Sequence, residues 1–488
     1  MAASNRPAGS VDMATALSPY NGPWNQRLAA HLLRRAGFGG TPDEIARLAR
    51  MSATDAVGSL IHFPSTANWP QPDNVFDPYS GGFLPLARGR PGAMMMDQTA
   101  RQQLQMELRM KARDSIVSLQ QWWLQRMLTT PAPLQEKMTF YFHGHFTSTA
   151  IQKAVWPSYI YQQNQLFRSS ALGNLRELTR SVSKDPAMLL YLDNATSVKA
   201  HPNENYAREL MELFTLGHGN YTEQDIRESA RAFTGWTIDR RTGQFMDVAR
   251  IHDDGLKRFL GRTGNFTGDD VVNIIFQQPA AARFFATSLL NFFVYNDPEP
   301  ALVNSVAALL RRNDFNVAPV LSRIFRSNIF FSDRAYRALV KSPVEFVVGS
   351  YKLFGLNQID PTAQRALVQM GQVLFYPPNV AGWPGGSSWL TTQMMIAREN
   401  FATALTNAPI MANSTWLTSV PMSAPQATRD LIRTILQNDA SAAAVAKVQN
   451  YLNGVNTSAL GMLSGENYQE RVRGAAYLTM AMPAYQLN

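Results

Sequence analysis

The chain has 488 residues, 45% of them hydrophobic and 17% charged, which is typical of a globular protein with a sizeable buried core. Cysteine is absent, which excludes disulfides, thiolate catalysis and thiolate metal ligands, and no apolar run is long enough to predict a transmembrane helix. The net charge of +9 comes from scattered basic residues, which favours a mildly basic surface suited to an anionic polymer and gives no reason to expect nucleic-acid binding.

The first part of the chain predicts a loose start followed by helices. Residues 1–20 are small and polar, and no charged segment followed by an apolar one is visible, so we expect a flexible tail without a secretory signal. Residues 25–36 predict a helix, and Thr41 and Glu44 form a capping-box pattern that starts the next one. Residues 63–97 are rich in proline and glycine and predict a long irregular loop, of the kind that often forms a lid or a binding loop.

Helical periodicity dominates the rest of the chain, and strand-like alternation is scarce. The sequence therefore predicts a mainly α, large multi-helix globular fold, in which residues 21–488 form a single domain. At most a small β-hairpin is expected, between residues 244–251 and 257–260. Further helices are predicted at residues 99–128, 131–146, 156–167, 172–182, 269–276, 279–293, 301–310, 317–325, 343–354, 361–374, 388–405, 424–436, 442–451 and 465–480.

Two histidines at the end of a predicted helix, His143 and His145, are candidate metal ligands. In an extended segment they would share one face, whereas in a continuous helix they would diverge by about 200°. Gly144 between them permits the irregular geometry that a shared site needs. His252 and Asp253 offer further ligands, so a divalent metal such as zinc, manganese or iron could bind these four residues. The alternative is that the histidines are buried and bonded to backbone groups.

The segment 201–239 concentrates polar, chemically capable side chains. On a helix at about 100° per residue, its carboxylates and one guanidinium fall in a stripe roughly 140° wide. The stripe contains Glu204, Asn205, Arg208, Glu209 and Glu212. It is either a catalytic face or a set of helical ion pairs, such as Glu204 with Arg208, Arg208 with Glu212, and Glu209 with an arginine of the next helix.

A stiff, tightly turned loop is predicted between two helices at residues 375–389. It contains three prolines, three glycines and two tryptophans. Asn379 and Trp383 either pack the loop as a structural connector or face a ligand from a pocket wall.

Several short motifs are spread over most of the chain. They are HLLRRAGFG at 31–39, HGHFT at 143–147, DPAML at 185–189, YLDN at 191–194, NENYAREL at 203–210, TGW at 234–236, HD at 252–253, SPVE at 342–345 and PPNVAGWP at 377–384. In these motifs the sequence resembles the bacterial domain-of-unknown-function family 1800 (DUF1800). The resemblance implies a mostly helical, exported bacterial protein, often encoded beside a family related to sulfatases. It carries no catalytic assignment.

The motifs lead to three hypotheses. The favoured one is a hydrolase, metal-assisted, that acts on a polysaccharide or another anionic polymer, with Arg208 holding an anionic group and Glu204 or Glu209 as general base. The second is a metal-independent glycosidase or lyase with paired carboxylates. The third is a non-catalytic binding or assembly module that works with a sulfatase-like partner. The expected substrate-binding residues are Asn203, Asn205, Asp193, Trp236, Asn379 and Trp383, and the expected metal ligands are His143, His145, His252 and Asp253.

Overall fold

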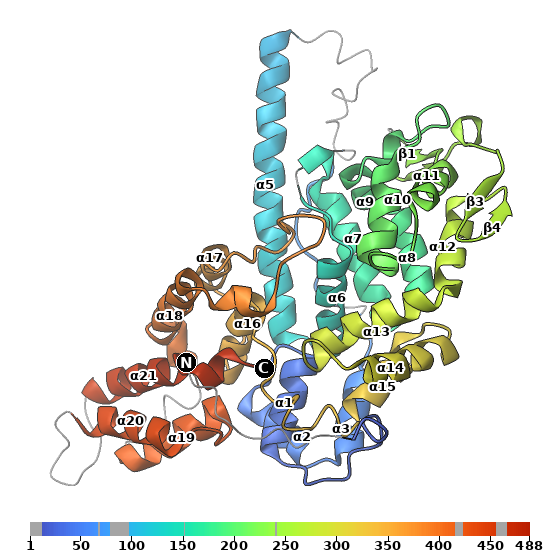
Figure 1. Cartoon of the computed structure of the whole chain (residues 1–488). Helices are drawn as coiled ribbons and strands as arrows, with labels where there is room; N and C mark the ends of the chain where they lie inside the picture. The colour runs from blue at the N-terminus through green and yellow to red at the C-terminus, as the bar shows by residue number, and fades with distance from the viewer. Residues whose placement is uncertain are drawn as a thin grey trace.

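The computed structural model describes residues 12–66, 69–78, 97–150, 152–239, 242–414, 423–454 and 466–488. The fold is mainly α, as predicted, and Figure 1 shows the helices grouped around a common centre, with α5 projecting from it. The α-helices are α1 Gln26–Ala36, α2 Pro42–Ala49, α3 Ala53–Ile61, α5 Gln98–Thr129, α6 Pro133–His145, α7 Pro157–Ser169, α8 Leu175–Ser183, α9 Pro186–Tyr191, α10 Glu204–Glu209, α11 Glu223–Ala232, α12 Gly268–Gln277, α13 Pro279–Phe293, α14 Pro300–Arg312, α15 Val317–Phe325, α16 Pro343–Leu353, α17 Pro361–Gln369, α18 Thr392–Thr406, α19 Ala424–Leu436, α20 Ala442–Asn453 and α21 Glu466–Met480.

Side-chain caps explain where many of these helices begin. The predicted capping box is present at α2, where Glu44 N donates to Thr41 Oγ1 and Thr41 N donates to the Glu44 carboxylate. The same reciprocal arrangement starts α11, α12 and α16. Proline at the first helical position of α2 and α16 fixes a helical φ where no amide donor is needed.

The strands form two separate antiparallel pairs, which corrects the predicted hairpin. Residues 244–251 and 257–260 do not pair with each other; each region pairs with a neighbour in sequence instead. Leu260 and Gly261 both have positive φ and form the two-residue turn that a tight hairpin requires, so the chain reverses at once. The pairs are β1 Trp236–Ile238 with β2 Phe245–Asp247, and β3 Lys257–Phe259 with β4 Arg262–Gly264.

The predicted flexible tail is wrong for residues 12–20, which pack against the body. Ala16 is fully buried and its carbonyl accepts from Ile329 N at 3.0 Å. Tyr20 N donates to the Arg326 carbonyl at 2.8 Å. The buried Ala16 side chain and these two backbone hydrogen bonds therefore hold the segment against the body, although its sequence shows no helical or strand periodicity. Residues 1–11 lie outside the described residues.

Residues 67–68 and 79–96 of the predicted irregular loop also lie outside the described residues. The described residues between α3 and residue 78 form no helix or strand. Two hydrogen bonds join them to α5. Phe76 N donates to Ser115 Oγ at 2.9 Å, and Trp122 Nε1 donates to the Pro70 carbonyl at 2.8 Å.

A buried ionic group joins α5, α6 and α7. Glu136 is fully enclosed, and its carboxylate accepts from Arg168 Nε at 2.7 Å, from Arg168 Nη2 at 3.0 Å and from Arg126. Trp123 Nε1 donates to the same carboxylate at 2.9 Å. Burial alone would raise the pKa of Glu136, but the two guanidinium groups outweigh it and lower the pKa. The group holds the three helices in a fixed relation at the base of α5.

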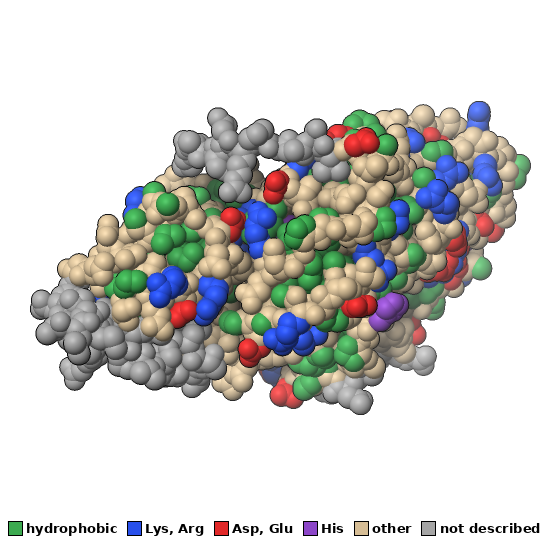
Figure 2. All heavy atoms as spheres, turned by 90° about the horizontal axis from the view of Figure 1, so that it is seen from below, with side chains coloured by type: hydrophobic (Ala, Val, Ile, Leu, Met, Phe, Trp, Pro, Cys, Tyr) green, Lys and Arg blue, Asp and Glu red, His purple; other side chains and the backbone are tan. Residues whose placement is uncertain are grey.

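One continuous apolar cluster runs through the whole fold, from Ala16 to Tyr485. The buried side chains of α5 lie between Leu108 and Leu128, so its N-terminal part extends beyond the body. The face drawn in Figure 2 shows basic and acidic side chains interspersed, without a continuous patch of either sign. That arrangement fits the scattered charge of the sequence.

Candidate binding cavity

A cavity of about 1090 Å³ lies where α6, α13, the start of α14 and the loop 375–389 meet. Its size is slightly above the roughly 300–1,000 Å³ that is typical of ligand sites. Rings, amides and hydroxyl groups dominate its lining. The rings are Phe140, Tyr141, Phe284, Phe292, Trp383 and Trp389, the amides are Asn220, Asn291, Asn296, Asn304, Gln372 and Asn488, the hydroxyl groups are Thr287, Ser288 and Ser342, and the charged residues are Arg283, Asp297 and Glu345.

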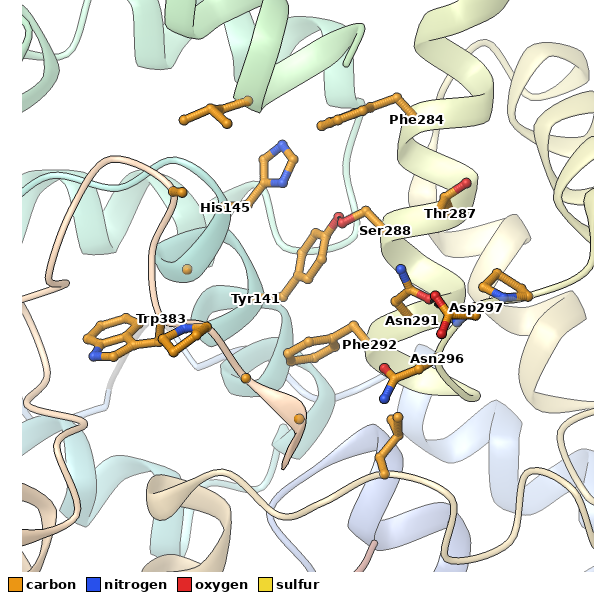
Figure 3. Close-up of a pocket in the computed structure, with 18 of the residues that line it drawn as sticks. Tyr141, His145, Phe284, Thr287, Ser288, Asn291, Phe292, Asn296, Asp297 and Trp383 are labelled. Atoms are coloured by element: carbon orange, nitrogen blue, oxygen red, sulfur yellow. Dashed lines mark hydrogen bonds between the residues drawn. The ribbon is translucent and has the colours of Figure 1, made fainter. Parts of the chain in front are cut away.

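Helix α6 supplies one wall through Tyr141 and His145, which are four residues apart and therefore on one helical face. Their rings stack at a centroid distance of 5.6 Å and an angle of 20°. The Tyr141 hydroxyl donates to Ser288 Oγ of α13 at 2.7 Å, as Figure 3 shows. Burial raises the pKa of Tyr141, so it stays a neutral phenol at the cavity wall.

His145 is a neutral imidazole in a fixed tautomer. Its Nε2 lies 2.9 Å from the Phe214 carbonyl. Because a carbonyl can only accept, Nε2 carries the proton and Nδ1 keeps a free lone pair. Burial lowers the pKa of His145 to about 4, so the ring carries no charge at neutral pH.

Helix α13 supplies the opposite wall. Arg283, Thr287 and Asn291 follow one another at intervals of four residues, so they form a polar row on an otherwise apolar helix. Just after the helix, Asp297 has positive φ, and its backbone N donates to Asn291 Oδ1 at 3.1 Å. Figure 3 shows Asn291, Asn296 and Asp297 together at this end of α13.

The loop 375–389 contacts the end of α6 and the segment that follows it. Phe375 N donates to His143 Nε2 at 3.1 Å, and Thr149 Oγ1 donates to the Pro377 carbonyl at 3.2 Å. A Cβ on Gly382 would lie 2.5 Å from the Gly144 carbonyl oxygen, so only glycine permits this contact. These contacts fix the loop that presents Trp383 to the cavity.

The structure does not bring the four predicted metal ligands together. Helix α6 is continuous through His143 and His145, so the rings point to different partners, Phe375 N and the Phe214 carbonyl. Burial lowers the pKa of His143 to about 3. Among the described residues, no group of three His, Asp or Glu side chains is placed to hold an ion. Metal binding stays a prediction.

His252 and Asp253 lie instead beside the end of α11. His252 Nδ1 lies 2.7 Å from the Thr234 carbonyl. Arg231 donates to the Asp253 carboxylate at 2.7 and 3.0 Å. This bidentate pair lowers the pKa of Asp253 to about 2. The two residues thus fasten the β3 region to α11.

No residue of the polar stripe 204–212 lines the cavity. Arg208 donates to the Glu223 carboxylate at 2.9 Å from two nitrogens, and to Glu204 at 3.5 Å. Burial first, and the neighbouring Glu212 second, raise the pKa of Glu209. The predicted pair of Arg208 with Glu212 does not form. A π-helix, η4 Leu210–Thr215, follows α10 and shifts the register, and the Glu212 carboxylate accepts from the Tyr221 hydroxyl at 2.7 Å instead.

Most of the predicted substrate-binding residues also have structural partners. Asn203 caps α10 and donates to the Asp193 carbonyl at 3.0 Å, while the Asp193 carboxylate pairs with Lys153 at 2.6 Å. Trp236 is buried under the Lys184 ammonium, at 5.0 Å. Asn205 Nδ2 lies 3.4 Å from the Leu192 carbonyl, and Asn379 Oδ1 accepts from Ala381 N at 2.9 Å.

Of the predicted site residues, Trp383 and His145 line the cavity. The sequence reasoning missed α13, which contributes Thr287, Ser288 and Asn291. Polar residues repeated every four positions in an apolar helix were the signal that could have indicated this wall.

Comparison with known proteins places the chain in a family. A profile described as a protein of unknown function (DUF1800) matches residues 31–487. The chain belongs to the DUF1800 family. No curated protein and no solved structure matches it. Three of the segments by which the sequence resembles DUF1800, at 143–147, 342–345 and 377–384, contribute to the cavity, whereas 203–210 and 252–253 do not. Of the helices described, none is both long enough and apolar enough to span a bilayer.

Proposed function

We propose that this DUF1800 protein binds a short stretch of a polysaccharide in the cavity between α6 and α13. The observation that carries the proposal is the lining, which combines aromatic rings with amide and hydroxyl groups. Sugar rings have apolar faces that pack on aromatic rings, and they have hydroxyl groups that need both donors and acceptors. Phe292 and Trp383 offer the aromatic faces, and Asn291 and Asn296 offer the donors and acceptors.

The charges of the cavity favour a neutral polysaccharide over a strongly anionic one. Burial would raise the pKa of Glu345, but the Lys137 ammonium bonded to it outweighs burial and lowers the pKa, so the two form a neutral pair. His145 is uncharged, and Arg283 and Asp297, the other charged side chains of the lining, have opposite signs. An anionic polymer would leave most of its charge without a partner here.

The proposal extends to hydrolysis of the bound chain. Glycoside hydrolysis needs an acid and a base placed on two sides of one bond. The cavity contains the carboxylates of Asp297 and Glu345, and Glu345 is bound by Lys137 and by Ser342 N at 2.7 Å. Asp297 is the exposed one. The non-catalytic alternative, a binding module beside a sulfatase-like partner, needs only the lining.

The proposal is tested by isothermal titration with neutral and acidic oligosaccharides, together with an assay for newly released reducing ends. Binding of a neutral oligosaccharide is expected, and Trp383→Ala should weaken it about tenfold or more, or ~1.4 kcal/mol, because a stacking face is lost. Thr287→Trp should also weaken binding, because the added ring occupies part of the cavity beside α13.

Trp122→Ala is the matched control, since Trp122 is half-buried on α5 away from the cavity. It should leave binding unchanged. Absence of binding to every oligosaccharide would overturn the proposal. So would an affinity in both Trp383→Ala and Thr287→Trp that equals the affinity of the unmodified chain. Reducing ends that appear with the unmodified chain and disappear with Asp297→Asn would extend it to hydrolysis.

A further inference from the structure

A second, small cavity of about 20 Å³ lies between α1, α16 and the last residues of the chain. Three cationic side chains line it: Arg34 from α1, and Arg337 and Lys341 from the segment before α16. Glu345 and Gln437 line it as well. This site shares Glu345 and Asn488 with the cavity described above but contains none of its aromatic rings. It gives a role to the HLLRRAGFG motif, which the proposed function leaves unexplained.

Two of the cations are buried without full hydrogen bonding. Arg34 is 8% exposed; its Nη1 donates to Gln437 Oε1 at 2.8 Å, but its Nε and Nη2 are buried and have no partner among the described residues. Lys341 is 5% exposed, and its ammonium lies 3.7 Å over the Tyr485 ring. A buried donor without an acceptor costs roughly 1–3 kcal/mol, and more when it is charged.

The nearby carboxylates are already paired with other cations. Glu345 is bonded to Lys137, and Asp439 lies 3.0 Å from Arg337 Nε. Within the part of the chain that the structure describes, no Asp or Glu side chain is in ion-pair contact with Arg34 or Lys341. Among its side chains, the site therefore contains more positive than negative charge.

The pKa directions agree with that excess of charge. Burial lowers the pKa of Arg34 to about 10. Burial also lowers the pKa of Lys341 well below its usual value, and the nearby Arg34, Arg337 and Arg398 lower it further. The environment thus penalises each cation, and a bound negative charge would relieve the penalty.

The small volume favours a monatomic anion. A cavity needs about 10–15 Å³ to admit one water-sized particle, so about 20 Å³ admits one small ion. Phosphate, sulfate and carboxylate groups have several heavy atoms and need more space than this. We propose that Arg34 and Lys341 bind a chloride ion in this cavity.

Two measurements on the full chain test the chloride site. In crystals grown with sodium bromide, anomalous scattering should give a bromide peak in contact with Arg34 and Lys341. In thermal unfolding, Tm should rise saturably with sodium chloride, and sodium gluconate at equal ionic strength should give a smaller rise, because a ligand that binds only the folded state stabilises it by mass action.

The variant Lys341→Met keeps the length of the side chain without its charge and should remove the chloride-specific rise in Tm. Lys199→Met, at an exposed lysine, is the control and should keep it. A map that shows only water at the site, or an equal chloride effect in Lys341→Met, would overturn the proposal. If Lys341→Met does not fold, the bromide map and the salt titration of the unmodified chain still decide.

Discussion

Asp185 begins α9 with a carboxylate that is almost entirely enclosed. Its Oδ1 accepts from Gln163 Nε2 at 2.8 Å and from Met188 N at 3.2 Å. Burial raises the pKa of Asp185 to about 7, although these donors act in the opposite direction. The folded protein therefore holds a proton on this group over a pH range in which an unfolded chain releases it.

The expected result is a loss of stability with rising pH. Because the folded pKa is the higher one, the stabilising contribution of Asp185 is complete below about pH 4 and is lost as the pH rises through about 7. Asp185→Asn keeps the acceptor oxygen without the charge, so its Tm should fall less between pH 4 and pH 8 than that of the unmodified chain. Calorimetry at several pH values measures this, with the exposed Asp254→Asn as control. Parallel curves for Asp185→Asn and the unmodified chain would contradict the expectation.

At the scale of elements, two groups of Arg and Glu side chains are expected to contribute very different amounts to the free energy of unfolding. The Arg126–Glu136–Arg168 group is buried between helices, whereas the Glu204–Arg208–Glu223 group lies on the surface of α10 and α11. Glu136→Gln leaves two buried guanidinium groups without a negative partner and should cost about 3–5 kcal/mol. Glu204→Gln should cost less than about 1 kcal/mol, because water screens the exposed pair.

Urea unfolding of the two variants measures these free energies of unfolding. A large loss in Glu204→Gln, or a negligible one in Glu136→Gln, would contradict the assignment of buried and exposed roles. Because the surface group is outside the cavity, Glu204→Gln should also leave oligosaccharide binding unchanged. That result would count against the catalytic role that was predicted for Glu204 from its spacing.

Helix starts could be predicted from the local sequence, whereas the ion pairs of the stripe at residues 204–212 could not. The helix start at Thr41 was predicted because a capping box is a local pattern. The stripe at residues 204–212 was interpreted with a uniform period of 3.6 residues, but η4 breaks that period, and tertiary contacts determine which carboxylate meets which cation. A spacing of four residues indicates a possible ion pair. Only the fold decides whether the two side chains meet each other or other partners.

At the scale of the whole molecule, the cavity combines segments that are far apart in sequence. Gly144 and Gly382 touch, and Trp383 was an expected site residue because its loop is stiff. The wall formed by α13 carries no motif, so its participation depended on which helix packs against α6. Fold class was thus predictable from periodicity, whereas the composition of the cavity depended on long-range packing.

The last residues of the chain are expected to support both cavities. Lys341 N donates to the Gln486 carbonyl at 2.9 Å, Arg398 Nη1 donates to Gln486 Oε1 at 3.1 Å, and Asn488 N donates to the Leu339 carbonyl at 2.8 Å. Removal of residues 483–488 should lower Tm by several degrees and abolish both oligosaccharide binding and the chloride effect, because buried donors lose their acceptors.

Removal of residues 487–488 alone is the graded control. It deletes the bridge between Val340 and Leu487 and leaves Gln486 in place, so its loss of stability should be smaller. Full stability and binding after removal of residues 483–488 would contradict this account. Calorimetry and the titration already described measure both quantities.

The contact between Gly144 and Gly382 and the position of Asn488 also affect folding during synthesis. A ribosome releases α6 long before the loop at residues 375–389, and that loop before Asn488, so the cavity is incomplete until all of these segments have been made. A ligand that binds the cavity can therefore stabilise only a chain in which all of them are present.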